Sequence, residues 1–304
     1  MVTVTAVIPA TFGEIQAQFA AARHSTASWD ALIDIFHWVD VEIQPELRDG
    51  FANSMAFLVS MRGALGLHLH ETCLVATQDT DNDQCSAARL MFHSMGQIAK
   101  GFEYPKPYVL QFDTDPAVFR VRLFGPAMAF AVEISAILMR IAAQLKNNPF
   151  GQPVKITGRR IATGSIVKAV NEDTKSRLDF LTPLAMRQGQ EMQDAPTAVL
   201  RGVLRRASGV LAWYGLGLPQ PFSEVQDRLA LQFKLAHWEA RSERSEAWFH
   251  PSSRQKRRFR EFGTRGVLAL GASVGDVYGL FKLGEAVHAG SKTTIGCGRF
   301  RLSN

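Results

Sequence analysis

The sequence predicts an α+β fold arranged as two successive domains, and three observations lead to this prediction. The chain has 304 residues, more than one typical domain, and 46% of them are hydrophobic, which is enough for two cores. Short alternating stretches typical of strands are interspersed with longer stretches that have helical spacing. A linker at Lys146–Pro153, rich in Asn, Gly and Pro, divides the pattern into predicted domains at residues 1–148 and 149–304.

The first half begins with a predicted strand at Val2–Ile8, where threonine alternates with apolar residues. Apolar spacing then predicts helices at Thr11–Arg23, Ser28–Val41 and Phe51–His70. Two strands are predicted at Tyr108–Phe112 and Val118–Leu123, followed by a buried helix at Phe124–Leu145. Strands that pair across such helices favour a ferredoxin-like unit, the split β-α-β arrangement.

The second half repeats this mixed plan without a visible residue-level repeat. Strands are predicted at Val154–Ile161, Ser165–Val170, Arg177–Leu184, Ala247–Phe249, Gln255–Phe262 and Gly266–Gly271. Helices are predicted at Ala195–Tyr214, Phe222–Ala240 and Val274–Ala286. We therefore expect two tandem ferredoxin-like domains.

Composition restricts the partners and the compartment. The net charge of +6 and a sequence pI near 9.4 favour a polyanionic partner. Three scattered cysteines favour neither a disulfide framework nor a zinc site, so we expect no metal, no cofactor and a cytoplasmic location. The apolar run Phe124–Leu145 is interrupted by Pro126, Glu133 and Arg140, so no membrane association is expected.

Two basic segments of the second half are the candidate binding elements. Between residues 252 and 265 there are six basic residues and one acid, and strand alternation would place Arg254, Lys256 and Arg258 on one face. The alternative is a solvated edge strand protected by charge. The second segment, at 284–302, combines glycines, which permit positive φ, with cations that suit a phosphate chain. Its informative residues are His288, Gly290, Lys292, Gly296, Gly298, Arg299 and Arg301.

The segments Ser252–Arg257 and Gly279–Phe300 resemble the C-terminal half of CRISPR precursor-RNA processing endoribonucleases. Shorter similar pieces are Met61–Gly66, Pro105–Leu110 and Asp179–Leu184. These enzymes belong to the RAMP superfamily, whose members commonly have two ferredoxin-like domains and a C-terminal glycine-rich loop. The unusual N-terminus and the basic, helical middle of the second domain favour a divergent branch, and the type IV CRISPR processing protein is the first expectation.

The resemblance implies metal-independent cleavage, in which a ribose 2′-hydroxyl attacks the adjacent phosphate and leaves a cyclic phosphate. Such a step needs in-line positioning, a base near the 2′-oxygen and cations for the developing charge. His24 is the candidate base, because nucleases of this family often keep the base in the N-terminal domain, and Arg23 is the alternative catalyst. His24 could instead stabilise a helix C-terminus. His37, His68 and His70 lie on stretches predicted to be helical and are expected to be structural.

The expected RNA partners are the CRISPR repeat hairpin and the mature crRNA, together with other subunits of an effector complex. Arg201, Arg205 and Arg206 on one predicted helix, and Arg241 and Arg244 after the next, are expected to contact hairpin phosphates. Solvated helix faces are the alternative for these arginines. Two other functions stay open: a non-catalytic subunit that binds guide RNA, and a metabolic enzyme whose basic loop binds a phosphorylated small molecule.

Overall fold

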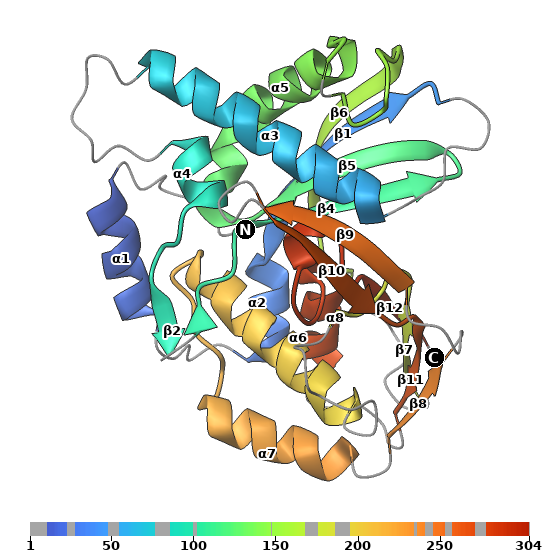
Figure 1. The fold of residues 1–304 in the computed structure, drawn as a ribbon. Helices are drawn as coiled ribbons and strands as arrows, with labels where there is room; N and C mark the ends of the chain where they lie inside the picture. Colours follow the sequence, from blue (N-terminus) through green and yellow to red (C-terminus); the bar gives the residue numbers. More distant parts are fainter. Residues whose placement is uncertain are drawn as a thin grey trace. The chain divides into compact units, whose positions relative to one another are not determined.

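The computed structural model describes most of the chain as two compact units (Figure 1). The described residues are 11–22, 28–47, 55–76, 86–99, 102–146, 148–167, 176–185, 195–233, 236–240, 246–252, 257–270 and 278–303. The first unit comprises Met1–Ala22, His37–Gly164 and Ala212–Gly215, and the second comprises Arg23–Phe36, Ser165–Leu211 and Leu216–Asn304.

The first unit contains a four-stranded sheet in the strand order β4-β5-β1-β6. Its elements follow the chain as β1 (His37–Pro45), α3 (Met55–Ala76), β4 (Tyr108–Thr114), β5 (Ala117–Leu123), α5 (Ala131–Ala143) and β6 (Ile156–Ser165). β5 pairs antiparallel with both β1 and β4. Numbered within this β-α-β-β-α-β series, the strands stand in the order 2-3-1-4, which is the ferredoxin-like topology.

The second unit repeats this topology in the strand order β12-β7-β11-β8. Its series is β7 (Arg177–Phe180), α6 (Ala195–Ala212), β8 (His237–Ala240), β11 (Gly266–Ala269), α8 (Tyr278–Val287) and β12 (Phe300–Ser303). All three neighbouring pairs are antiparallel. Helix α7 (Phe222–Phe233) and the hairpin of β9 (Glu246–Ser252) and β10 (Arg257–Gly263) are insertions. The predicted α+β class with two ferredoxin-like units is confirmed.

The short helices begin at residues whose side chains satisfy the first backbone N–H groups. At α1 (Phe12–Ala21), the Thr11 hydroxyl accepts from the Glu14 N–H, and the Glu14 carboxylate accepts from the Thr11 N–H. At α2 (Trp29–Ile35) the Ser28 hydroxyl accepts from the Ala31 N–H, and at α4 (Ala87–Phe92) the Ser86 hydroxyl accepts from the Arg89 N–H. These caps explain why helices start at the positions that the sequence indicates.

Several predicted helix ends are wrong. The helix predicted through Val41 ends at Ile35, and β1 follows, because apolar and polar residues alternate with period two from Val39 to Gln44. The helix predicted through Ala240 ends at Phe233 and is followed by β8. The predicted helix at 124–145 begins as the 3-10 helix η1 (Gly125–Phe130) and continues as α5.

Strand β6 belongs to the first sheet, although it lies beyond the predicted boundary at 148/149. The Thr157 hydroxyl donates to the Gln44 carbonyl over 3.1 Å, and Glu46 N–H donates to the Lys155 carbonyl over 2.8 Å, which ties β6 to β1. The strand predicted at Val2–Ile8 lies outside the described residues.

One face of the first sheet is apolar and packs against α3 and α5 (Figure 1). Val41 and Leu110 both stand opposite Val121 in the strand register, and all three are fully buried. Phe57 of α3 packs against Phe112 of β4, with ring centroids 4.8 Å apart. By length and composition alone Gly125–Ala143 could span a membrane, but half of it is buried in the structure.

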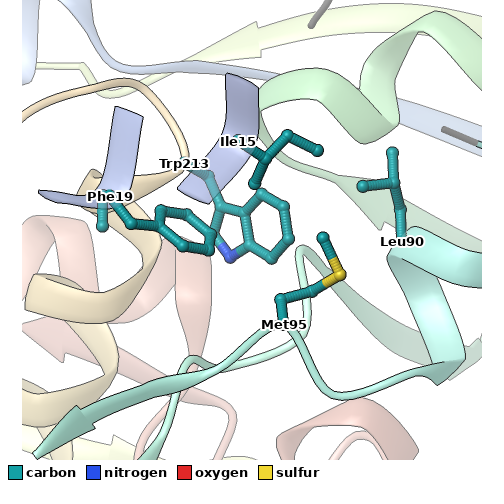
Figure 2. Packing of buried hydrophobic residues seen from close by; sticks show 6 residues of the cluster. Ile15, Phe19, Leu90, Met95 and Trp213 are labelled. Atoms are coloured by element: carbon teal, nitrogen blue, oxygen red, sulfur yellow. The ribbon is translucent and has the colours of Figure 1, made fainter. Parts of the chain in front are cut away.

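A second core of the first unit forms around Trp213 (Figure 2). Trp213 packs with Ile15, Phe19, Leu90 and Met95, and Phe19 meets it edge-on at a centroid distance of 4.7 Å. Its indole N–H donates to the Pro105 carbonyl over 2.8 Å. The indole thus contributes both apolar contact and a satisfied polar group to this core.

Candidate nucleic-acid interface

The glycine-rich loop of the second unit connects α8 to β12. Five residues of the loop have positive φ: His288, Gly290, Lys292, Gly296 and Gly298, at 67°, 77°, 61°, 82° and 70°. A short 3-10 helix, η4 (Thr293–Ile295), lies between Lys292 and Gly296. The repeated left-handed positions fold the loop tightly back on itself.

Close backbone contacts explain why two of these positions are glycine. A Cβ at Gly298 would lie 1.9 Å from the Ala289 carbonyl oxygen, and a Cβ at Gly290 would lie 2.9 Å from that of Ala185. Neither position has room for a side chain without a shift of the backbone. These glycines therefore serve packing inside the unit.

Thr182 anchors the loop to the segment that follows β7. Its hydroxyl donates to the Gly296 carbonyl over 2.6 Å and accepts from the Arg299 N–H over 2.9 Å. Gly298 N–H donates to the Pro183 carbonyl, and Ser291 N–H to the Ala185 carbonyl. Many backbone donors of the loop are thus used within the protein, and its side chains are the groups that reach solvent.

The cations of the loop differ in exposure. Lys292 and Arg301 are exposed, and Arg299 is half-buried. His288, which the sequence places among the RNA contacts, is fully buried in the structure. The described geometry therefore presents Lys292, Arg299 and Arg301 at the surface of this loop, while His288 lies inside.

Helix α6 packs directly on the loop and adds two exposed arginines. A Cβ at Gly202 would lie 2.8 Å from the Gly290 nitrogen, so glycine allows the close approach. Arg206 is buried, and its Nε donates to the Val287 carbonyl over 3.0 Å. Arg201 and Arg205 are exposed one turn apart. The structure thus brings Arg201, Arg205 and the loop cations together on one unit, whereas Arg206 is structural.

The basic hairpin is described only as backbone. Residues of β10 pair with β9, and Arg258 stands opposite Pro251. Arg254 and Lys256 lie between β9 and β10 in the sequence, Arg241 and Arg244 lie between β8 and β9, and all four are outside the described residues. Their role in RNA binding stays a prediction.

The predicted catalytic residues also lie outside the described residues. Helix α1 ends at Ala21, α2 begins at Trp29, and Arg23 and His24 fall in the connection between them. Of the histidines expected to be structural, His68 is buried, and its Nε2 lies 2.9 Å from the Gln144 side-chain oxygen. His37 lies on β1 instead of a helix, and its carbonyl accepts from the Tyr214 hydroxyl.

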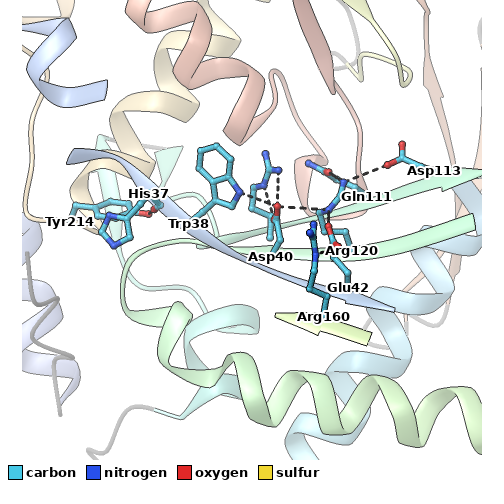
Figure 3. A network of polar contacts seen from close by, with 10 residues as sticks. His37, Trp38, Asp40, Glu42, Gln111, Asp113, Arg120, Arg160 and Tyr214 are labelled. Carbon is cyan, nitrogen blue, oxygen red and sulfur yellow. Dashed lines mark hydrogen bonds and ion pairs between the residues drawn. The ribbon is translucent and has the colours of Figure 1, made fainter. Parts of the chain in front are cut away.

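The other face of the first sheet carries an ionic network that sequence reasoning missed (Figure 3). Asp40 stands opposite Arg122, which holds it with two hydrogen bonds of 2.9 and 3.0 Å. Glu42 stands opposite Arg120, whose Nε lies 2.6 Å from it, and also accepts from Arg160 over 2.9 Å. The signal was the spacing: two acids and two arginines, each pair two residues apart on a strand.

The environment of Glu42 keeps it ionised. Burial would raise the pKa of Glu42, but hydrogen bonds from Arg160 and Arg120 and their positive charges outweigh it, so the pKa is lowered. The guanidinium of Arg122 also lies over the Trp38 ring, 4.3 Å from its centroid. Because these arginines are already paired with carboxylates, this face offers less to a phosphate backbone than their number suggests.

A family model matches the part of the chain that holds the loop. Residues 178–300, from β7 to the first residue of β12, match the family described as CRISPR-associated endoribonuclease Cas6. The match spans less than half of the chain. Over this part, the resemblance to CRISPR precursor-RNA processing endoribonucleases is confirmed.

Solved structures of this family are similar at low identity. Cas6 from Thermus thermophilus is 17% identical with a TM-score of 0.46, covering 88% of this chain and 98% of that chain. The type IV crRNA endonuclease Csf5 is 11% identical with a TM-score of 0.41, covering 88% and 100%. The product of a Cas6-related gene from Pyrococcus furiosus is 10% identical with a TM-score of 0.43, covering 88% and 99%. No curated protein matches the sequence.

Proposed function

We propose that this protein is an endoribonuclease that cleaves CRISPR precursor RNA at its repeat hairpins and remains bound to the mature crRNA. The observation that carries the proposal is the family match over residues 178–300, which includes the glycine-rich loop. The exposed cations on α6 and on the loop support it, because a row of guanidinium and ammonium groups suits a phosphate backbone. In this proposal the protein works in the cytoplasm with other effector-complex subunits, and the type IV branch remains the proposed subtype.

The proposed reaction needs no group beyond the chain and the RNA. The ribose 2′-oxygen attacks the adjacent phosphorus as its proton passes to a base, and the 5′-oxygen leaves with a proton, giving a 2′,3′-cyclic phosphate. His24 is the proposed base, and Arg23 the proposed holder of the scissile phosphate, whose added negative charge a guanidinium stabilises. If Arg23 acts without histidine, we expect slow, single-turnover cleavage.

The test is single-turnover cleavage of the cognate repeat RNA in EDTA, with mass spectrometry of the upstream product. We expect a product that ends in a 2′,3′-cyclic phosphate. RNA that stays bound and intact would instead identify a non-catalytic guide-binding subunit. No binding of the repeat at all would refute both RNA functions.

The catalyst is assigned with two variants and one control. His24→Ala and Arg23→Ala are each expected to lower the cleavage rate by about 100-fold or more, the usual contribution of a general base or a charge stabiliser. Arg140→Ala, an exposed arginine on α5, is the matched control and should cleave at the wild-type rate. Wild-type rates in both test variants would place the catalyst elsewhere in the chain.

A further inference from the structure

Five basic side chains gather beside α3 and α4 of the first unit. They come from α3, from α4 and the residue after it, and from the segment before β4, elements that Figure 1 labels. They are Arg62, His70, Arg89, His93 and Lys106. We call them the α3–α4 basic cluster.

Direct contacts hold this cluster together. The Lys106 ammonium donates to the His93 carbonyl, and the rings of His93 and His70 meet with centroids 5.3 Å apart. The Arg62 guanidinium lies over the Phe92 ring, 5.3 Å from its centroid, so an aromatic face orients it. Gly66 allows α3 to approach the same ring, because a Cβ there would lie 2.9 Å from Phe92.

Two sequence segments that are not part of the candidate interface both contribute to the α3–α4 basic cluster. Met61–Gly66 and Pro105–Leu110 both belong to the resemblance described above, and each contributes one cation of the cluster. Arg62 comes from the first segment and Lys106 from the second, and each acts electrostatically on the other. The fold thus brings together positive charges that are more than forty positions apart in sequence.

Positive charge exceeds negative charge in the described part of this region. Within the described residues, no carboxylate forms an ion pair with Arg62, His93 or Lys106, and the Arg62 Nε is buried without a hydrogen-bond acceptor. Glu103 is the acid that acts on Lys106. The connection at 77–85 contains Asp79, Asp81 and Asp83 and lies outside the described residues.

The ionisation of the cluster reflects this excess. The pKa of His93 is lowered by the partial burial of its ring and then by the charges of His70, Lys106 and Arg89. The pKa of Lys106 is lowered by burial and by Arg62, against an opposing effect of Glu103. An anion placed among these groups would relieve their mutual repulsion.

We propose that the α3–α4 basic cluster binds a backbone phosphate of the RNA, as a second binding point separate from α6 and the glycine-rich loop. Arg62 offers donors in a fixed fork that matches two phosphate oxygens, and Lys106 adds a point charge. His70 and His93 are both exposed and add imidazole N–H groups. The choice of RNA as the source of the phosphate rests on the function proposed above.

The first test compares the double variant Arg62→Gln/Lys106→Gln with the control Arg140→Gln/Lys155→Gln, which removes the same charge from exposed positions of the same unit. Binding of the repeat RNA is measured by fluorescence anisotropy across a range of salt concentrations, after thermal melting shows that each variant is folded. We expect the double variant to bind about tenfold more weakly. We also expect the slope of log affinity against log salt concentration to become shallower by about 0.7 to 0.9 for each phosphate that the variant no longer neutralises.

Equal affinity and slope in the test and control variants would overturn the proposal. If the double variant does not fold, Lys106→Gln alone takes its place, and Lys106→Arg should restore the wild-type slope. If the wild-type protein binds RNA without cleaving it, the proposed cleavage is refuted. The comparison of salt slopes between test and control variants still decides whether the cluster binds RNA.

The second test follows the imidazole signals of His93 and His70 by NMR during pH titration. Bound RNA should raise the pKa of His93, because a nearby phosphate favours the imidazolium, and RNA affinity should increase as pH falls through that pKa. Inorganic phosphate alone distinguishes the source of the anion. A rise in the pKa with inorganic phosphate but none with RNA would show that the cluster takes a free anion and would overturn the RNA assignment.

Discussion

Glu42 shows how one buried carboxylate organises a sheet face. It accepts from Arg120 and Arg160, which come from the two strands on either side of β1. The Arg120 guanidinium also donates to the Gln111 side-chain oxygen on β4 over 2.9 Å. Directly or through Arg120, Glu42 on β1 is thus connected to polar side chains from the other three strands of the first sheet.

Glu42→Gln should destabilise the protein by roughly 1–3 kcal/mol at neutral pH, because it removes the carboxylate that Arg120 and Arg160 share. The measurement is urea denaturation. The contribution of Glu42 to the free energy of unfolding is complete at pH values above its ordinary pKa of 4.5. It is lost as the pH falls through the lowered pKa that Glu42 has in the folded state. The difference between the variant and the wild type should therefore shrink in acid.

The matched control is Glu46→Gln. Glu46 is exposed and lies 3.6 Å from the exposed Lys155, so its removal should change the free energy of unfolding by no more than about 0.5 kcal/mol. Equal effects of the two substitutions would mean that the ion pairs around Glu42 contribute no more to the free energy of unfolding than a surface ion pair does.

At the scale of the element, the glycine-rich loop depends on close backbone packing. Gly298→Ala should destabilise the protein by about 3 kcal/mol or more, because its Cβ would meet the Ala289 carbonyl at a positive φ. Gly63→Ala, in α3 with open space around the new Cβ, should instead stabilise by about 0.5–1 kcal/mol. Thermal denaturation measures both. A neutral Gly298→Ala would mean that the loop adopts another backbone path.

Helix α6 is the element whose surface should contribute most clearly to RNA binding. Arg201→Ala/Arg205→Ala should weaken binding of the repeat RNA about tenfold or more and reduce the salt slope, because both side chains are exposed beside the loop. Arg228→Ala, on the exposed face of α7, is the control and should weaken binding less. A shallow slope in the wild type would instead favour a phosphorylated small molecule as the ligand.

Element types were largely predictable, because hydrophobic periodicity and capping residues act locally. Strands β4 and β5 and helices α1, α6 and α8 lie close to their predicted positions. β1 was missed because Ile35, Phe36 and Val39 also suit a helical pattern, and the arginines that pair with its acids lie on β5 and β6, 78 to 118 residues away. Local sequence does not show such pairings.

The residue types of the candidate site could be predicted from the sequence, but which of these residues are exposed could not. Glycine and arginine spacing located the loop and α6. It could not distinguish the buried Arg206 and His288 from their exposed neighbours, because burial depends on packing between segments remote in sequence. Thr182, which anchors the loop over more than a hundred positions, carries no signal of its own in the sequence.

At the scale of the whole molecule, one topology occurs twice with different additions. The first unit carries the paired ionic face and the α3–α4 basic cluster. The second carries the inserted hairpin and the glycine-rich loop. Sequence periodicity predicted both units, but not that short segments such as Ala212–Gly215 would belong to a unit remote in the chain.

The strand order of the second sheet has a consequence for how the protein is made. Among the described strands, β7 at Arg177–Phe180 pairs with β11 and β12, which follow it by more than eighty and more than one hundred residues. Until those strands leave the ribosome, the backbone edges of β7 have no partners in its own sheet, and pairings of such long range form slowly. We therefore expect the second unit to fold only after its last strand has been translated.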